Sequence, residues 1–381
     1  MITSRRLDAS THSSFDAHEQ VVHFNDTALG LDAIIAVHNT HLGPSLGGCR
    51  IYPYAHFDDA LYDVLRLSRG MTYKSALAGL PLGGGKAVII GDPRSIKSHD
   101  FMARFGEAVE SMGGAYITAE DVGSSEEDMI SISSTTTYVA GLPQTDPASD
   151  GVAGNPSPVT AYGVYCGLKA CVKHVFGSSD LKGRKVAIQG LGAVGYALAQ
   201  YLTKEEARIF VADIHPAVLE RAKSEFGSLL TIGDVSSIHT LDVDIFAPCA
   251  LGAGLNDRTI PEIKAKIIGG AANNQLAEAH HDRLLVERGI LYAPDYAINS
   301  GGITSVGYEY FDRTGRNPYP YPLTRTRMND HVEGIAKTLE KIFSLAKSEG
   351  IGTGAAANQL AEKIFKAAPS SAQVRIEASN A

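Results

Sequence analysis

Apolar residues in the first 150 positions form short runs of the length of buried strands, separated by stretches with helical spacing. The strand-like runs lie at 21–24, 31–38, 87–90 and 116–118. Helix-like stretches follow Asp58, which we expect as an N-cap, then His99, and then Ser124 or Ser125. Residues 43–48, with three glycines and a proline, are predicted to form a loop. This order indicates an α/β domain with a mixed sheet.

A stretch rich in Pro, Gly, Ser and Asp at 141–158 predicts a linker or a loop beside a cleft. Beyond it strands and helices alternate, which is typical of a parallel sheet covered by helices. The predicted strands lie at 185–189, 208–212, 243–247, 267–269 and 289–293, and the clearest helices at 159–174 and 328–348. We therefore expect two α/β domains with a cleft between them. Residues 1–148 form the first, residues 149–328 form a Rossmann-type second, and residues 329–381 form a helical segment that returns to the first.

Composition excludes several classes of protein. The chain has 381 residues, 44% of them hydrophobic, enough for two cores. The net charge of -8 and the scattered basic residues argue against nucleic acid or an anionic membrane as a partner. The four cysteines show neither metal-ligand nor disulfide spacing, so no metal centre is expected. A signal-peptide core and a membrane-spanning run are both absent, which favours a cytoplasmic protein.

Two lysines, Lys74 and Lys86, lie twelve positions apart in the otherwise uncharged segment 71–90. An amine withdrawn from water gives up its proton more readily and can then act as an acid, a base or a nucleophile. Glycines at 83–85 remove side chains where a small ligand could lie against the backbone. The alternative is a glycine turn with a solvated lysine ahead of a buried strand, and the pattern alone leaves both open.

A glycine-rich turn follows the predicted strand at 185–189 and opens the next helix. Its residues are Gly190, Leu191, Gly192, Ala193, Val194 and Gly195. Asp213 ends the following strand, 23 residues beyond Gly190, near the spacing of about 20 seen in dinucleotide sites. Asp213 would bind the ribose 2′-hydroxyl and repel a 2′-phosphate, so the pattern favours NAD over NADP. A plain turn in a sheet without a ligand is the alternative.

Several blocks, in this order, resemble the amino acid dehydrogenase family of leucine, valine, phenylalanine and glutamate dehydrogenases, and most closely its leucine branch. The blocks are 47–50, 71–74, 82–86, 118–123, 154–163, 190–195, 271–276 and 294–302. The resemblance implies reversible oxidative deamination of an L-amino acid to a 2-oxo acid, ammonia and NADH, with hinge closure. It also implies a homo-oligomer, a dimer or an octamer, built through the first domains. Cys49 and Ser300 depart from the family pattern without removing a charged group, and residues beyond Ser348 match poorly.

The resemblance also assigns roles to individual residues. Lys74 would bind the substrate carboxylate, and Lys86 would be the catalytic lysine that activates water. Asp121 would be the partner acid/base, although an aspartate after a strand can equally cap a turn. Asn274 would orient the polar end of the substrate, and the pair Asn273-Asn274 could also be a plain turn. The remaining implied contacts are Gly47 and Gly48 for the substrate carboxylate, and Ser157, Thr160, Cys249, Ala250, Leu251, Asn273 and Asn299 for the cofactor.

Substrate preference is predicted from four positions. In glutamate dehydrogenases a lysine precedes the Gly-Gly pair and a serine lies deeper, whereas this chain has Leu46 and Val306 there. With Ala119 and Ile303 they would form an uncharged pocket, where an unpaired carboxylate would cost several kcal/mol. Ile303 adds about one methylene relative to the usual valine, which favours leucine, valine and isoleucine over phenylalanine. Two other functions remain as alternatives: an aromatic amino acid dehydrogenase and a non-catalytic NAD sensor, and the intact lysines and Asp121 argue against the sensor. The four pocket residues could also be ordinary core residues.

Overall fold

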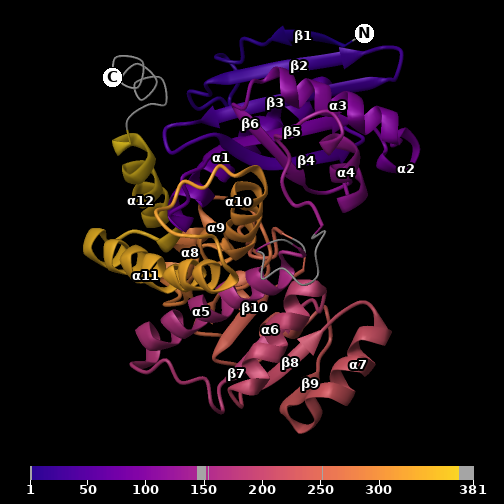
Figure 1. The fold of residues 1–381 in the computed structure, drawn as a ribbon. Coiled ribbons are helices and arrows are strands. Elements are labelled where there is room, and N and C mark those ends of the chain that lie inside the picture. Colours follow the sequence, from indigo (N-terminus) through magenta and orange to yellow (C-terminus); the bar gives the residue numbers. More distant parts are fainter. Residues whose placement is uncertain (1, 144–151, 153, 251, 369–381) are drawn as a thin grey trace. The chain divides into compact units, whose positions relative to one another are not determined.

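The computed structural model describes residues 2–143, 152, 154–250 and 252–368 (Figure 1). The chain divides into two compact units. Unit 1 comprises Met1–Asn155, Ser305–Arg325 and Ala361–Ala381, and unit 2 comprises Pro156–Thr304 and Thr326–Leu360. Residues 305–325 thus group with the first unit, whereas the expected ranges placed all of them in the second. The functional roles given to those ranges stay predictions.

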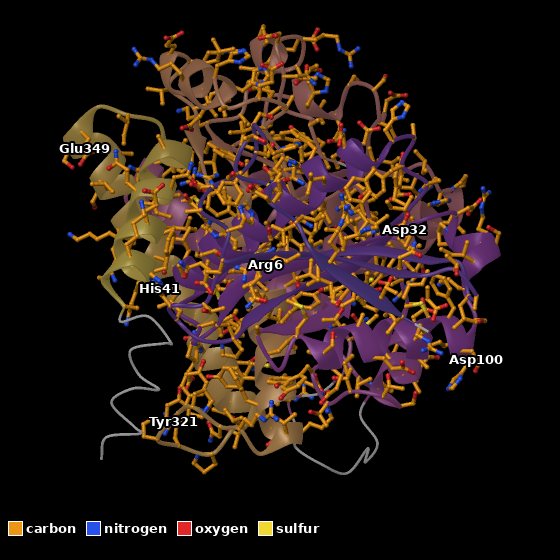
Figure 2. The ribbon with its side chains drawn as sticks, turned by 90° about the horizontal axis from the view of Figure 1, so that it is seen from above. Arg6, Asp32, His41, Asp100, Tyr321 and Glu349 are labelled. Atoms are coloured by element: carbon orange, nitrogen blue, oxygen red, sulfur yellow. The ribbon has the colours of Figure 1, made fainter. Side chains whose placement is uncertain are left out.

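Unit 1 contains the mixed sheet expected from the sequence, with the order β1-β2-β3-β5-β4-β6. Its strands are β1 Thr3–Arg6, β2 Gln20–Asp26, β3 Leu31–Asn39, β4 Ser45–Tyr52, β5 Gly83–Ile90 and β6 Tyr116–Glu120. The first 120 residues also supply helices α1 Phe57–Ala78, α2 Pro93–Ile96 and α3 His99–Ser111, and α4 Glu126–Ser133 follows. β4 runs parallel to β5 and β6, whereas β1, β2, β3 and β5 pair antiparallel. Strands β2 and β3 are also joined by side chains, since His23 on β2 lies 2.6 Å from Asp32 on β3. Asp32 is labelled in Figure 2.

The prediction of a loop at 43–48 was wrong for Ser45–Gly48, which belong to β4. Here the glycines permit close strand packing. A Cβ on Gly47 would lie 1.8 Å from the Gly85 carbonyl oxygen, and one on Gly48 would lie 2.6 Å from the Glu120 carbonyl oxygen. Strand β1, which was not predicted, forms an edge of this sheet with all of its residues exposed.

Helix α1 begins two residues earlier than the predicted N-cap at Asp58 implies. Its N-cap is His56, and Asp58 lies in the first turn, where the helix dipole favours an acid. The helix ends at Ala78, and Gly79 caps it in the left-handed conformation with φ 69°. Lys74 therefore lies inside the helix, four residues before its end at Ala78. The lysine is consequently held on a rigid element.

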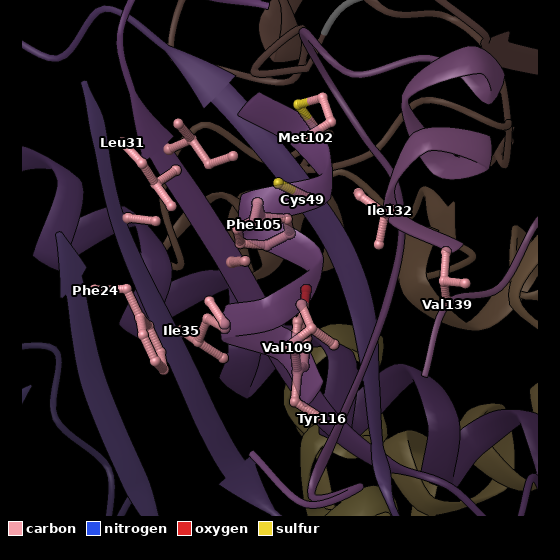
Figure 3. Close-up of a cluster of buried hydrophobic side chains, with 14 of the residues drawn as sticks. Phe24, Leu31, Ile35, Cys49, Met102, Phe105, Val109, Tyr116, Ile132 and Val139 are labelled. Carbon is pink, nitrogen blue, oxygen red and sulfur yellow. The ribbon is translucent and has the colours of Figure 1, made fainter. Parts of the chain in front are cut away.

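Alternate residues of β3 enter two different cores, as the two-residue period of a strand requires. Ile35 and Val37 join the cluster that contains α3 and α4 residues, part of which Figure 3 shows. Ile34 and Ala36 join a second cluster with Val64 and Leu65 of α1. The sheet of unit 1 is therefore covered on both faces, and its central strands β3 and β5 are buried along most of their length.

Unit 2 is built on six parallel strands in the order β12-β11-β10-β7-β8-β9, the order of dinucleotide-binding sheets. They are β7 Lys185–Gln189, β8 Arg208–Ala212, β9 Leu230–Ile232, β10 Ile245–Pro248, β11 Ile267–Ile268 and β12 Leu291–Tyr292. The helices of the second half are α5 Ser157–Phe176, α6 Ala193–Lys204, α7 Pro216–Phe226, α8 His281–Glu287, α9 Asp295–Ile298, α10 Gly301–Thr314, α11 Arg325–Glu349 and α12 Thr353–Ala367, with short 3₁₀ turns at Gly227–Leu229, Ile238–Thr240 and Ile260–Glu262. The Rossmann-type prediction is confirmed.

Three of these helices contain residues of both units, and in α11 only the first residue, Arg325, belongs to unit 1. α10 belongs to unit 1 from Ser305 onward, and α12 belongs to it from Ala361 onward. The Asp282 carboxylate accepts the N–H groups of Gly354 at 3.1 Å and Ala355 at 3.0 Å, which caps the start of α12. Across the part of the chain that the structure describes, no helix combines the length and apolar character needed to span a bilayer.

Buried His38 makes the stability of unit 1 dependent on pH. The side chain is 4% exposed, its Nδ1 lies 2.8 Å from Thr72 Oγ1, and burial together with nearby His18 lowers its pKa from 6.5 to about 4. The unfolded chain therefore takes up this proton first as the pH falls. We expect stability to be complete above pH 6.5 and to fall by up to about 3 kcal/mol between 6.5 and 4, at ~1.4 kcal/mol per unit.

Urea unfolding of the wild type and the His38→Gln variant, near pH ~7.5 and ~5, measures this contribution. The variant should lose less stability on acidification than the wild type. His99→Gln, at an exposed histidine, is the matched control and should keep the wild-type pH dependence. Equal losses in the wild type and His38→Gln would contradict the prediction.

Candidate active site

Lys86 and Asp121 form a buried ion pair in unit 1. Lys86 lies on β5 and is 6% exposed, and Asp121 directly follows β6. β4 lies between these two strands, and both β5 and β6 run parallel to it. The Lys86 Nζ atom is 2.8 Å from Asp121 Oδ2. The structure thus brings together the two residues that the sequence marked as a catalytic pair.

The Asp121 carboxylate also contacts Arg50, whose Nε lies 3.1 Å from the same Oδ2 atom. Burial alone would raise the pKa of Asp121, but the cations of Lys86 and then Arg50 outweigh it and hold this pKa below 3.8. Asp121 is therefore ionised at neutral pH. The pair offers a proton acceptor beside a buried amine, which is the arrangement that general acid–base chemistry requires.

The glycines at 83–85 lie in strand β5, not in a turn, and they pack closely against other segments of the protein. A Cβ on Gly84 would lie 2.0 Å from the Thr72 nitrogen of α1. At Gly83 it would meet the Asn39 carbonyl oxygen at 2.0 Å, and at Gly85 the Ser45 hydroxyl at 2.6 Å. Helix α1 therefore packs directly against the backbone of β5. Lys74 is partly buried two residues beyond Thr72.

The residues predicted to select the substrate lie on three elements. Leu46 on β4 and Ala119 on β6 are buried, and Ala119 pairs in register with Gly48. Val306, also in unit 1, is partly buried on α10. Ile303 lies three residues earlier on the same helix, in the part assigned to unit 2, and is buried. Residues three apart on a helix share a face, so Ile303 and Val306 project on one side of α10.

In unit 2, the three glycines of the 190–195 turn have three different environments. Gly190 has φ 97°, a backbone conformation that side chains disfavour. A Cβ on Gly195 would lie 2.1 Å from the Gly190 carbonyl oxygen, so α6 packs tightly on the turn. Gly192 is the N-cap of α6, and a Cβ there would meet nothing within 4 Å. Open space at a helix N-terminus, where the dipole is positive, suits a phosphate.

Asp213 follows β8 and lies beside this turn. Its carboxylate accepts hydrogen bonds from the Leu191 N–H at 2.7 Å and from the His215 N–H at 2.8 Å. On the other side, a Cβ on Gly190 would lie 2.9 Å from the Ala250 Cβ, and one on Gly195 would lie 3.2 Å from the Cys249 Cβ. The structure therefore gathers most of the predicted cofactor contacts around one turn, whereas Leu251 lies outside the described residues.

A second group of predicted residues follows β11. The Asn299 amide donates to Asn273 Oδ1 at 2.9 Å and to the Ala271 carbonyl oxygen at 3.1 Å. Asn274 has φ 50°, and its N–H donates to Asp295 at 2.7 Å. Among the described residues, nothing donates to the buried Asn299 Oδ1. This amide oxygen is thus available to accept a hydrogen bond from a ligand.

Ser157 and Thr160 lie in the first turn of α5, at the start of unit 2. The Thr160 hydroxyl donates to the Pro156 carbonyl oxygen at 3.0 Å. A Cβ on Gly302 would lie 2.6 Å from Thr160 Oγ1, so the first turn of α10 packs closely beside this residue. Two separate segments of unit 2 therefore meet at Thr160.

Known protein families match along nearly all of this chain. The family described as "Glu/Leu/Phe/Val dehydrogenase, dimerisation domain" matches residues 18–138, and "Glutamate/Leucine/Phenylalanine/Valine dehydrogenase" matches residues 151–232 and 217–370. The chain belongs to the Glu/Leu/Phe/Val dehydrogenase family. This confirms the resemblance noted from the sequence blocks.

Individual relatives match this chain over most of its length. A leucine dehydrogenase of Geobacillus stearothermophilus is 48% identical over 91% of this chain and 90% of its own. A phenylalanine dehydrogenase of Lysinibacillus sphaericus is 45% identical over 92% and 89%. The crystal structure of an L-tryptophan dehydrogenase from Nostoc punctiforme matches with a TM-score of 0.79 and 42% identity, over 92% of this chain and 96% of the other.

Dehydrogenases of this family work with a nicotinamide cofactor, and the residues of unit 2 fit such a group. The open space at Gly192 accommodates a phosphate close to the backbone. The unpartnered Asn299 Oδ1 suits the N–H of a carboxamide. The Asp213 carboxylate, which accepts two backbone N–H groups beside this turn, is of the acceptor type that suits a hydroxyl group. Each of these features is an observation on this chain, independent of its relatives.

Sequence reasoning missed two residues of the site. Arg50, which contacts Asp121, lies in the first matching block, but its partner could not be inferred without the parallel pairing of β4 with β6. Asp295 accepts hydrogen bonds from Asn274 N–H and from the Tyr292 hydroxyl at 2.8 Å, and so holds the segment after β11. Both residues lie in quoted blocks, and that position was the only available signal.

One further cluster in unit 2 contains residue types that bind metals: Asp257, His280 and His281. His281 Nδ1 accepts the Glu278 N–H at 2.9 Å, so in the neutral ring the proton is on Nε2. That nitrogen faces Asp257 Oδ1 at 3.3 Å. The ring therefore presents a proton and not a lone pair, which disfavours metal binding at this cluster.

Proposed function

We propose that this chain catalyses the NAD-dependent, reversible oxidative deamination of branched-chain aliphatic L-amino acids to 2-oxo acids and ammonia. The observation that carries the proposal is the buried Lys86 amine, 2.8 Å from the Asp121 carboxylate. It is supported by the leucine dehydrogenases among the relatives, at 47–48% identity. Unit 1 would supply the acid–base groups, and unit 2 would bind the cofactor.

In this proposal Lys74 binds the substrate α-carboxylate, with Gly47 and Gly48 beside it. When bound, the nicotinamide supplies the hydride acceptor. Lys86 then takes a proton from the water that attacks the imino carbon, and Asp121 moves protons on and off the amino nitrogen. Asn274 orients the polar end of the substrate. An ionised Asp121 matches this role, because the group must begin as a proton acceptor.

NAD is proposed over NADP because of Asp213. A carboxylate placed beside the adenosine ribose accepts hydrogen bonds from its hydroxyls and repels a 2′-phosphate. Further contacts proposed for the cofactor are Ser157, Thr160, Cys249, Ala250, Asn273 and Asn299, together with the 190–195 turn.

Branched-chain substrates are proposed because Leu46, Ala119, Val306 and Ile303 are all uncharged. A phenylalanine or other aromatic amino acid dehydrogenase is the second candidate, since relatives named for phenylalanine and tryptophan are 45% and 42% identical. We also propose a homo-oligomer, supported by the description of the first family segment as a dimerisation domain. A cytoplasmic location is proposed from the cysteine pattern of the sequence.

NADH formation from NAD and a panel of L-amino acids at alkaline pH tests the proposal. We expect the highest kcat/KM for leucine, valine or isoleucine. The value for phenylalanine should be at least ~10-fold lower. Glutamate should fall ~10³-fold or more below leucine, because its carboxylate would be buried without a partner. Faster turnover of phenylalanine would favour the second candidate. No turnover of any amino acid, with NADH still bound, would indicate a sensor.

A further inference from the structure

Arg50 joins two carboxylates that come from different elements of unit 1. Its side chain, on β4, is 20% exposed. The Nε atom lies 3.1 Å from Asp121 Oδ2, and Nη1 lies 2.7 Å from Asp63 Oδ2. Asp63 belongs to α1, the helix that carries Lys74. The planar guanidinium therefore spans the distance between α1 and the residue that follows β6.

Asp63 is itself held in place, so Arg50 has a fixed anchor. The Tyr54 hydroxyl donates to Asp63 Oδ2 at 2.7 Å, and Arg66 donates to its other oxygen at 3.1 Å. The Asp63 side chain is only 13% exposed. Electrostatic attraction between these groups is thus less screened than at the surface.

Asp121 receives both cations on one oxygen. Lys86 Nζ and Arg50 Nε each approach Oδ2, from β5 and from β4. The backbone of Asp121 is fixed as well, because its N–H donates to Ser124 Oγ at 2.9 Å and that hydroxyl donates to the Cys49 carbonyl oxygen at 2.8 Å. If Lys86 changes its protonation state during turnover, Arg50 keeps the carboxylate in place.

We propose that Arg50 is a positioning residue for Asp121, holding its carboxylate in orientation and in its ionised form through the anchor at Asp63. The inference rests on the proposed function, in which Asp121 is the acid/base group. Arg50 acts only through Asp121 and touches no reacting atom in this proposal. Its fork geometry is essential, since lysine cannot bridge two carboxylates with fixed donors.

The pH dependence of the reaction should reveal this role. The titratable groups that interact with Asp121 are Lys86 on β5, Arg50 and Cys49 on β4, and Tyr116 and Glu120 on β6. Asp63 on α1 shares Arg50 with Asp121, and Asp128 on α4 interacts with Cys49 and Glu120. Arg50 and Lys86 are the cations among them that contact the carboxylate. Removing Arg50 makes the ionised carboxylate less favourable, so Asp121 should take up a proton at higher pH.

The test is the pH profile of kcat/KM for leucine in the wild type, Arg50→Gln, Arg50→Lys and Arg104→Gln. For Arg50→Gln we expect kcat/KM at neutral pH to fall ~10–100-fold. The acidic limb of the profile, the pH range in which kcat/KM declines as the pH is lowered, should shift to higher pH by about one unit or more. Arg50→Lys keeps the charge, so its acidic limb should stay near that of the wild type while kcat recovers only in part. Arg104 also bridges two carboxylates in unit 1, Asp26 and Glu107, and Arg104→Gln should keep the wild-type profile.

An acidic limb unchanged in Arg50→Gln would overturn the inference, as would an equal shift in Arg104→Gln. If Arg50→Gln does not fold, Arg50→Lys decides: full recovery of wild-type kcat overturns the geometric part of the inference, and partial recovery with an unmoved limb supports it. A wild-type protein that binds NADH but turns over no amino acid would overturn the proposed function itself. That result is distinct from an active wild type whose Arg50→Gln variant shows an unchanged acidic limb, which would overturn only the role of Arg50.

Discussion

Replacing Lys86 with methionine is expected to lower kcat for leucine deamination by ~10³-fold or more and to leave NADH binding unchanged. The reason is that Lys86 would supply the amine that activates water, whereas the proposed cofactor contacts lie in unit 2. Methionine matches the length of the lysine stem, so the buried site keeps most of its packing. Steady-state kinetics and NADH fluorescence titration measure the two quantities separately.

The matched control is Lys97→Met. Lys97 pairs with Asp128 at 2.6 Å in the same unit, but its side chain is more exposed than that of Lys86, 26% against 7%, and its partner is not Asp121. We expect Lys97→Met to keep kcat within a few-fold of the wild type. Near-normal turnover in the Lys86 variant, with the fold intact by circular dichroism, would refute the role assigned to that amine.

Replacing Asp213 with asparagine is expected to reduce the preference for NAD over NADP by ~10²-fold or more. Hydrogen bonds to a charged group contribute about 1.5–3 kcal/mol, so the KM for NAD should rise ~10–100-fold. The repulsion of a 2′-phosphate would disappear at the same time, so activity with NADP should rise. The ratio of kcat/KM for the two cofactors, measured with leucine, reports both changes.

Asp244→Asn serves as the control for this variant. The Asp244 carboxylate also accepts a backbone N–H, that of Lys185 at 2.9 Å. Asp244 precedes β10, whereas Asp213 follows β8, so Asp244 lies at the amino-terminal ends of the parallel strands, away from the turn. The cofactor preference of this control should equal that of the wild type. A preference for NAD that survives intact in Asp213→Asn would show that other residues select the cofactor.

The sheet of unit 2 was the most predictable part of the fold. β7 and β8 have the predicted bounds, Lys185–Gln189 and Arg208–Ala212, because each is an apolar run delimited by polar or glycine residues. β11 and β12 are only two residues long, so a wider apolar run could mark their place but not their ends. The alternation of strands and helices predicted that these strands run parallel, which the strand pairs confirm.

Unit 1 was less predictable, for two physical reasons. In β4, glycines normally indicate a loop, yet here they allow strands and helix to approach closely, and that depends on the tertiary structure. β1 has all four residues exposed, so it carries no alternation of buried and exposed positions that a sequence could reveal. The candidate site was likewise predictable only in part. Lys86 and Asp121 could be identified by residue type and motif, but the contact of Arg50 with Asp121 depends on the pairing of the strands.

The close contact between Gly84 and Thr72 bears on any attempt to redesign this enzyme for new substrates. A side chain at position 84 would displace the helix that carries Lys74, so a mutant library at the glycine triplet would mainly yield unfolded or misassembled proteins. Libraries aimed at Ile303 and Val306 would instead replace side chains that already project from α10, without adding a side chain at a close backbone contact. Directed evolution of specificity should therefore begin on α10.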